Sequence, residues 1–270
     1  MCEIVYVPVE HSRQWISQYS NFEIPLPPIS VQQEIVRILD SFTQLQSNLE
    51  AELAARYKQY EYYRDSLFSE DLESLLGRSD CDVKTIGDLG SLTRGKRFVR
   101  TDIVENGIPC IHYGDMYTCY GLKAEIANTH ITPEKAKSMR FAQKGDVVIV
   151  GAGENDWDIG VGLVWQGEEP AAIHDACYIL EHNQDPMYIS HYLRSTVYHL
   201  QLRKYVSSGK ISSFAAKDLA KIYIPIPSLD RQKEIVSILD TFEALIANIK
   251  NEIEARKKQY EYYREKLLTF

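Results

Sequence analysis

Two stretches of the chain, near its beginning and at its end, share one pattern of apolar positions. Apolar residues recur at spacings that alternate between four and three, which is typical of a helix that packs along one stripe. Neither stretch contains proline or glycine after its first residues, so each can form about 38 residues of continuous helix, roughly 57 Å long. The pattern predicts two long helices with N-caps at Ser30 and Asp230.

The two stretches are copies of one sequence, offset by 200 positions. Ile24–Phe68 and Ile224–Leu268 are identical at 24 of 45 positions, and each opens with a proline-rich segment that resists helix. Both stripes carry one extra spacing of four at the same place, and together they predict an antiparallel coiled coil within one chain. The predicted packing or partner-contact positions are Phe42, Leu45, Leu49, Arg56, Tyr60 and Tyr63, and Phe242, Leu245, Ile249, Arg256, Tyr260 and Tyr263.

One position of each stripe is charged. Arg56 and Arg256 each follow a glutamate, Glu52 or Glu252, by four residues, a spacing that allows an ion pair on one helix face. They either set the register of the coiled coil or contact a partner protein.

The segment between the repeats changes to short apolar runs separated by turns. Residues 147–150, 159–165 and 171–180 are predicted strands, and a helix follows that Asp185 caps. The buried face of that helix is predicted to include Ile189, Tyr192, Leu193, Val197 and Leu200. The fold class is therefore α+β, with one mixed α/β domain added to the two long helices.

Basic and aromatic residues gather in the loops of this domain. The chain of 270 residues has a net charge of −8, but the segment from Lys84 to Thr101 contains five positively charged residues and only one acidic residue, Asp88. Local clustering decides phosphate binding, because salt screens charges beyond about 10 Å. Polar and aromatic loop residues would then read base edges. The predicted DNA-binding residues are Arg94, Lys96, Arg97, Arg100, His112, Tyr113, Tyr117, Asn155, Trp157, Ser208, Lys210 and Ser212.

Motifs for catalysis are missing from the sequence. The segment 90–97 approaches a P-loop, but Arg97 stands where serine or threonine must hold magnesium. The histidines are scattered, the five cysteines form no CxxC pair, and no methyltransferase or nuclease motif is present, so we expect neither a catalytic site nor a metal site. No apolar run approaches the ~18 residues of a membrane span and no signal-peptide pattern opens the chain, which predicts a cytoplasmic protein without membrane contact.

These residues resemble the specificity subunits of type I restriction-modification systems. The likeness covers nearly the whole chain and rests on IPIPxxxxQxEIVxILDxF in both copies, the KQYEYYR helix ends, TIGDLGSLTRGKR with GIPCIHYGDMY, and SSGKISSFAAKDLAKIYIPIP. It implies a subunit that recognises double-stranded DNA and holds no cofactor itself. It also implies methylation subunits that bind S-adenosylmethionine and modify adenine, and a restriction subunit that uses ATP and Mg²⁺.

The chain departs from the family pattern in having one recognition domain where a full member has two. The expected segments are 1–23 as the tail of a missing domain, 24–76 as the first leader and helix, 77–221 as the recognition domain, and 222–270 as the second leader and helix. The chain is then a natural half subunit that forms a homodimer, a remnant of a truncated gene, or a laboratory truncation. A different class of function stays open: a scaffold or silent cassette that binds methylation subunits and reads no DNA.

Overall fold

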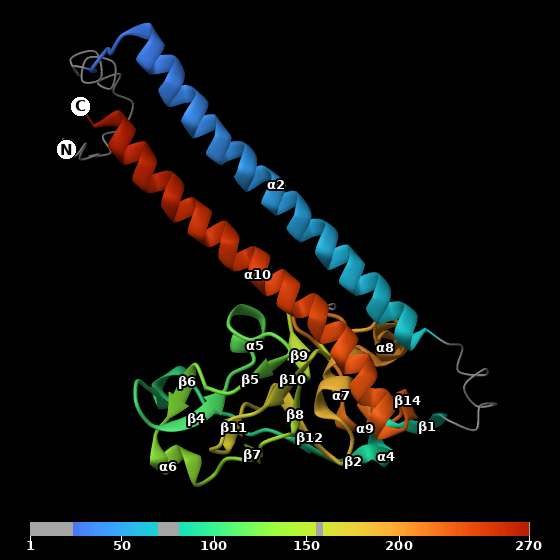
Figure 1. The fold of residues 1–270 in the computed structure, drawn as a ribbon. Helices are drawn as coiled ribbons and strands as arrows, with labels where there is room; N and C mark the ends of the chain where they lie inside the picture. The colour runs from blue at the N-terminus through green and yellow to red at the C-terminus, as the bar shows by residue number, and fades with distance from the viewer. Residues whose placement is uncertain (1–23, 70–80, 155–158, 270) are drawn as a thin grey trace. The chain divides into compact units, whose positions relative to one another are not determined.

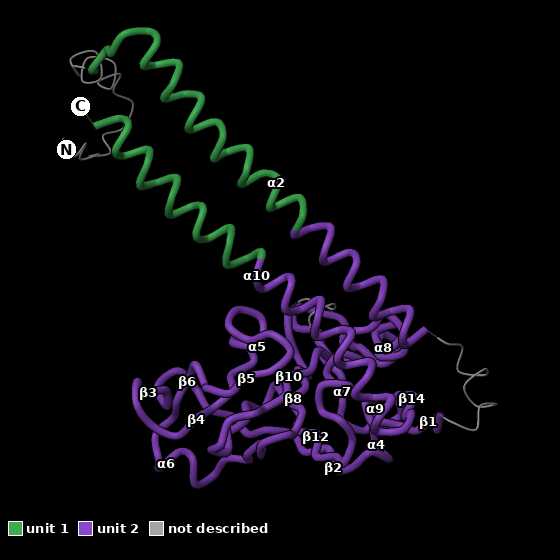
Figure 2. Tube along the Cα trace, viewed as in Figure 1, with its two compact units in different colours: residues 1–52, 249–270 green, residues 53–248 purple. Residues whose placement is uncertain are grey.

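The computed structural model describes residues 24–69, 81–154 and 159–269 of the chain (Figure 1). Two long helices, α2 (Ile29–Phe68) and α10 (Leu229–Leu268), each contain 40 residues, which confirms the two predicted helices and their approximate length. The chain divides into two compact units, coloured separately in Figure 2. Unit 1 is Met1–Glu52 with Ile249–Phe270, and unit 2 is Leu53–Asn248. The domain boundaries expected from the sequence stay a prediction.

Both long helices begin before their predicted caps. α2 starts at Ile29 and α10 at Leu229, so the N-cap positions are Pro28 and Ser228, two residues earlier than expected. The cause is the same contact in both copies: the side-chain amide of a glutamine donates to a leader carbonyl, from Gln32 to Pro27 at 2.7 Å and from Gln232 to Pro227 at 2.8 Å. This bond holds the leader against the first turn of each helix.

Unit 2 is built on two five-stranded sheets and two short ribbons. The first sheet has the order β2 (Gly90–Arg94), β12 (Cys177–His182), β8 (Val147–Val150), β10 (Gly162–Trp165), β5 (Lys123–Ala124). The second has the order β3 (Ile103–Val104), β6 (Thr129–Ile131), β4 (Ile108–Ile111), β11 (Ala171–Ile173), β7 (Phe141–Ala142). The ribbons pair β1 (Cys81–Thr85) with β14 (Tyr223–Pro227) and β9 (Ala152–Gly153) with β13 (Ser212–Ser213).

Short helices connect these strands. They are α4 (Ile86–Leu89), α5 (Asp115–Thr118), α6 (Pro133–Ala136), α7 (Pro186–Tyr192), α8 (Thr196–Leu202) and α9 (Ala216–Leu219), with 3₁₀ turns η1 (Arg100–Asp102) and η2 (Arg203–Tyr205).

The core of unit 2 lies around β8. All four residues of β8 are fully buried, and the strand pairs antiparallel with both β10 and β12. A continuous apolar run is what a strand covered on both faces requires, and the predicted strand 147–150 is confirmed at both ends. Helix α7 packs on this sheet, with Asp185 at its N-cap accepting from the backbone amides of Met187 and Tyr188. That predicted cap is confirmed.

The predicted helix after Asp185 is two helices. Ser195 caps α8 by accepting from the Tyr198 amide at 3.3 Å, so the chain turns between α7 and α8. The turn brings Tyr198 and Leu202 into the core, whereas Leu200 is 57% exposed. The prediction that Leu200 is buried was therefore wrong, because a single helical period was assumed across a serine cap.

Candidate nucleic-acid interface

The basic loop, residues 94–97 at the end of β2, is held in place by hydrogen bonds with distant parts of unit 2. Arg94 donates from Nε to the carbonyl of Asp175 at 2.7 Å, and the Lys96 amide donates to Ile173 at 2.9 Å. Arg140 donates from Nη1 to the Arg94 carbonyl at 2.5 Å. The side chains of Arg94, Lys96, Arg97 and Arg140 are all exposed, so four cations gather at this loop, three from the loop itself and Arg140 from a distant segment.

Arg140 was missed by the sequence analysis. It lies 43 positions after Arg97, in a segment with Lys137 and Lys144 that the sequence does not connect to the basic loop, and the pairing of β7 with β11 brings it there. Arg100, which was predicted, is exposed in η1 at the entry to the second sheet.

Four rings form a cluster beside the basic loop. His112 lies 4.5 Å from Tyr113, 4.7 Å from His174 and 5.8 Å from Phe98, measured between ring centroids. Phe98 is 2% exposed and anchors the cluster, and Arg97 is close enough to His174 to act on its pKa. Two predicted residues, His112 and Tyr113, are thus joined to the basic loop through Phe98 and His174.

Burial sets the protonation of the two histidines. It lowers the pKa of His112 below its ordinary value, against the opposing charge of Asp115. Burial also lowers the pKa of His174, with a smaller contribution from His112 in the same direction. Both rings are therefore neutral at neutral pH.

Two further predicted loops meet at the small ribbon. β9 and β13 pair with Gly153 opposite Ser212, and the hydroxyl of Tyr117 lies so close to Gly153 that a Cβ there would approach it to 3.0 Å. Tyr117 is 38% exposed, whereas Ser212 is only 2% exposed and so belongs to the ribbon's interior. Of the remaining predicted residues, Ser208 and Lys210 are exposed, and Asn155 and Trp157 lie outside the described residues.

A hollow links this ribbon to the basic loop. A cavity of about 440 Å³ is lined by Arg94, by Tyr178 of β12 and by Ser207, Ser213 and Phe214 around β13. The Tyr178 hydroxyl donates to the Phe214 carbonyl at 2.8 Å, which fixes the end of the ribbon against the first sheet. The structure thus brings together loops that are more than 100 residues apart in sequence.

The predicted coiled-coil residues pair in each unit. In unit 1, Phe42 stacks on Tyr263 with ring centroids 5.4 Å apart and meets Tyr260 edge-on at 6.4 Å. In unit 2, Tyr63 stacks on Phe242 at 5.1 Å. The two aromatic contacts use equivalent positions of the two copies and support the predicted antiparallel pairing.

The stripe is not uniformly buried. Leu45 and Leu245 are 38% and 40% exposed, and beside Leu245 it is Ile246, at 2%, that enters the core of unit 2. Leu49 and Ile249 are half-buried. The face of α10 that packs on the sheets in unit 2 is thus displaced by one residue from the predicted stripe at this position.

The two arginines of the stripe are half-buried and bonded on their own helices. Arg56 donates to Gln59 at 2.9 Å, and Arg256 donates to Gln259 at 2.7 Å. Arg256 also forms the predicted ion pair with Glu252, at 2.7 Å.

Unit 2 holds the end of α2 and the start of α10 through buried polar contacts. The Tyr60 hydroxyl is 3.0 Å from Nδ1 of His191, whose Nε2 is 3.1 Å from Oδ1 of Asp240. Gln232, fully buried, accepts from the Asp185 amide at 3.0 Å and donates to Gln184 at 2.9 Å. These bonds tie both repeat copies to α7.

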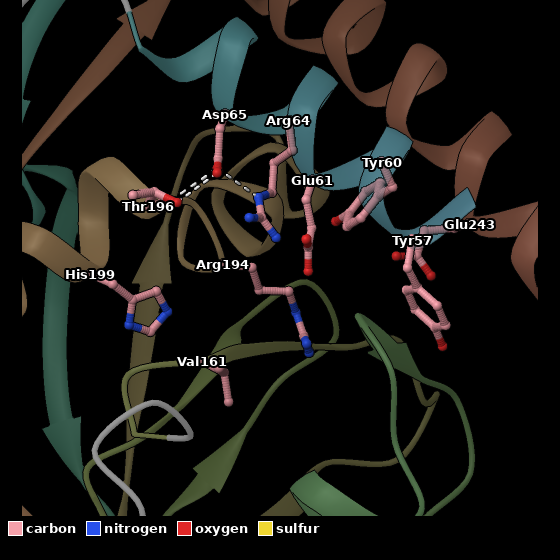
Figure 3. Close-up of a pocket in the computed structure, with 10 residues that line it drawn as sticks. All are labelled: Tyr57, Tyr60, Glu61, Arg64, Asp65, Val161, Arg194, Thr196, His199 and Glu243. Atoms are coloured by element: carbon pink, nitrogen blue, oxygen red, sulfur yellow. Dashed lines mark hydrogen bonds and ion pairs between the residues drawn. The ribbon is translucent and has the colours of Figure 1, made fainter. Parts of the chain in front are cut away.

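A pocket of about 460 Å³ opens beside the end of α2 (Figure 3). Asp65 joins α2 to α8 by accepting from the Thr196 hydroxyl at 2.6 Å, and Arg64 donates to the same carboxylate at 3.0 Å. Arg194 projects into this region and donates to the carbonyls of Gly121 and Gly162. Arg64 and Arg194 share the lining with the carboxylates of Glu61, Asp65 and Glu243, and no predicted DNA-binding residue lines the pocket.

No helix among the described residues is long and apolar enough to cross a membrane.

Comparison with known proteins gives consistent matches. Residues 13–57 and 78–255 match the family model of the type I restriction modification DNA specificity domain. The chain is 34% identical over 277 residues to the type I restriction enzyme EcoR124I/EcoR124II specificity subunit of Escherichia coli, covering 97% of this chain and 66% of that protein. It thus spans about two thirds of the length of that relative.

A relative of similar length and a solved structure also match. The putative type I specificity subunit S.MpnORF201P of Mycoplasma pneumoniae is 27% identical over 260 residues, covering 92% of this chain and 97% of that protein. The fold is similar to that of the HsdS subunit from Thermoanaerobacter tengcongensis, with a TM-score of 0.58 and 18% identity over 91% of this chain and 60% of the other. The family model covers most of the sequence, and the chain belongs to the type I restriction modification DNA specificity domain family.

Proposed function

We propose that this chain is the DNA-recognition subunit of a type I restriction-modification complex and has no catalytic site of its own. Residues 77–221 form the recognition domain, and the paired helices bind methylation subunits. S-adenosylmethionine, ATP and Mg²⁺ belong to the methylation and restriction subunits, which modify adenine and cleave DNA. The observation that carries the proposal is the convergence of the basic loop, the ring cluster and the β9–β13 ribbon in unit 2.

The proposed interface makes two kinds of contact: cations bind backbone phosphates, and other side chains read base edges. Arg94, Lys96, Arg97 and Arg140 neutralise backbone phosphates, because guanidinium and ammonium groups on a braced loop match regularly spaced anions. Base edges are read by the ring cluster and by the loop side chains near the ribbon. The residues assigned to reading are His112, Tyr113, Tyr117, Ser208 and Lys210, with Asn155 and Trp157 as predicted, while Arg100 extends the phosphate contacts and Ser212 holds the ribbon.

The test is a charge reversal in the complex with the methylation subunit. Changing Arg94, Lys96 and Arg97 to glutamate together should weaken duplex binding and reduce the slope of log K against log salt by about 3, since each phosphate contact contributes roughly 0.9. Lys144→Glu is the matched control, because Lys144 is an exposed cation of the same unit paired with Glu168 outside the proposed interface. Unchanged DNA affinity in the triple variant would exclude this interface.

The same experiment decides the alternative function. A scaffold or silent cassette would bind the methylation subunit through its exposed helix positions and leave duplex DNA free. That reading gains support if the unsubstituted complex assembles but neither retards DNA nor methylates it.

We further propose that the chain self-associates through unit 1. Apolar side chains at the beginning of the first repeat and the end of the second are exposed there, namely Ile24, Leu26, Ile29 and Leu268 at 78%, 82%, 71% and 53%. A second copy is the occupant we propose, because the two repeat copies already pair with each other through equivalent aromatic positions, Phe42 with Tyr263 and Tyr63 with Phe242. Sedimentation should show a dimer that Leu26→Asp dissociates, and a monomer at all concentrations would contradict it.

A further inference from the structure

The ring cluster contains two histidines, and the Nδ1 atom of each accepts a hydrogen bond from the backbone. Nδ1 of His112 accepts from the Gly114 amide at 3.1 Å, and Nδ1 of His174 accepts from the Ala176 amide at 3.2 Å. A nitrogen that accepts a hydrogen bond carries no proton, so a neutral ring with Nδ1 as acceptor holds its proton on Nε2. The backbone bond therefore fixes the tautomer of His112, whose Nδ1 has no carboxylate within bonding distance among the described residues.

The surroundings of the two Nδ1 atoms differ, and the Nε2 atom of His112 is open. Nδ1 of His174 also lies 3.3 Å from Oδ1 of Asp175, the next residue in the chain, whereas Nδ1 of His112 contacts only the Gly114 amide within the part of the chain that the structure describes. Nε2 of His112 has no hydrogen-bond partner among the described residues and is not one of the buried unpaired atoms there, so it is open to solvent. His112 thus presents a free donor beside the basic loop.

The orientation of this donor is fixed before any ligand arrives. Tyr113, His174 and Phe98 surround the His112 ring at centroid distances of 4.5, 4.7 and 5.8 Å, and the Gly114 bond prevents rotation of the ring. A donor held in one direction discriminates between acceptors at low entropic cost.

We propose that His112 is a specificity-determining residue that donates from Nε2 to a hydrogen-bond acceptor on a base edge in the major groove. Purine N7, guanine O6 and thymine O4 are such acceptors, whereas cytosine offers only an amino donor there. His112 thus rejects cytosine at the base that it contacts. This inference rests on the proposed function, because it assigns a role within the same interface.

The first test maps adenine methylation by the complex carrying one of three substitutions. His112→Phe keeps a ring in the cluster but has no donor, and it should reduce discrimination at one base position of the motif about tenfold, within the usual cost of one mismatch. His112→Gln restores a terminal donor and should restore that position. His130→Phe is the matched control, because His130 lies on β6 outside the ring cluster and the basic loop, and the motif of that variant should be unchanged.

The second test removes acceptors from the DNA. Duplexes would carry 7-deazapurines in place of N7, 2-aminopurine in place of guanine, or 5-methyl-2-pyrimidinone in place of thymine, one position at a time. One such deletion should weaken binding of the unsubstituted complex about tenfold and leave the His112→Phe complex unaffected. If His112→Phe does not fold, the folded His112→Ala complex takes its place in this cycle.

The outcomes separate the two proposals. A complex that methylates a defined motif, with that motif and every acceptor deletion indifferent to substitution of His112, overturns this inference and leaves the proposed function intact. A complex that neither binds nor methylates DNA overturns the proposed function and the inference together.

Discussion

The two copies of the repeat are identical at 24 of 45 positions and yet have opposite surroundings. Ile224 is fully buried in β14, which pairs with β1, whereas Ile24 at the same position of the first copy is 78% exposed. At the other end of the helices the relation reverses, since Phe68 of the first copy is 2% exposed and Leu268 of the second is 53% exposed. Each copy is buried at a different end, so a repeat sequence specifies a helix and a packing surface, and its neighbours decide which part of that surface is covered.

The largest difference should appear at the leader isoleucines. Ile224→Ala removes a fully buried side chain and should lower the free energy of unfolding by about 3 kcal/mol, through lost burial and the cavity that remains. Ile24→Ala removes an exposed side chain and should change it by less than about 0.5 kcal/mol. Urea unfolding followed by fluorescence of buried Trp165 measures both, and equal losses would show that the two leaders are equally packed.

The equivalent glutamines of the two copies, Gln232 and Gln32, test the same difference in surroundings. Gln232 makes three hydrogen bonds while fully buried, to Pro227, Gln184 and the Asp185 amide, whereas Gln32 is exposed and bonded to Pro27. Gln232→Ala should cost about 2 kcal/mol, because it leaves buried groups unpaired. Gln32→Ala should cost about 0.5 kcal/mol in the same urea titration. A small effect of Gln232→Ala would mean that water replaces these bonds.

The helices and the innermost strand could be predicted because their signals are local. A period between three and four residues without proline identifies a helix wherever it packs, and the uninterrupted run at 147–150 identifies a buried strand. The helix starts were wrong by two residues because Gln32 and Gln232 reach back to the leader, a contact that depends on side-chain geometry.

The candidate site was only partly visible in the sequence because it is assembled from distant segments. The cluster at 94–97 was found by charge, but Arg140 reaches it through the β7–β11 pairing and His174 through the turn before β12. Ser212 lies in a serine-rich segment that is typical of a loop, but it is buried in a ribbon that β13 forms with β9. Long-range pairing carries no local signature, so residues of this kind need the structure.

Acid should weaken the contact between the end of α2 and the domain. Burial lowers the pKa of His199 to about 4, and the charges of Arg64, Arg203 and Arg194 act in the same direction. The folded state keeps His199 neutral, while the unfolded chain binds a proton below the ordinary pKa of 6.5. The stabilisation is therefore present above pH 6.5 and is lost as the pH falls toward 4, by about 3 kcal/mol. Urea titrations across this window should show a shallower decline for His199→Gln, and identical profiles would contradict the assignment.

The smallest expected effect isolates one hydroxyl. Tyr60 and Tyr260 occupy the same repeat position, and each ring lies under an arginine four residues later, with Arg64 at 5.5 Å and Arg264 at 5.8 Å from the centroid. The cation–π contact is therefore matched in the two copies, and replacing each tyrosine by phenylalanine leaves it in place. What differs is the Tyr60 hydroxyl, which bonds to buried His191 at 3.0 Å.

Tyr60→Phe should therefore lower the free energy of unfolding by about 1 kcal/mol, because Nδ1 of His191 loses its partner where water cannot replace it. Tyr260→Phe should change it by less than about 0.5 kcal/mol in the isolated chain. If the chain self-associates through unit 1, raising the protein concentration should increase the cost of Tyr260→Phe toward that of Tyr60→Phe, since the second position would then be covered as the first one is. A cost that stays near zero at every concentration would mean that a second copy of the chain does not cover Tyr260.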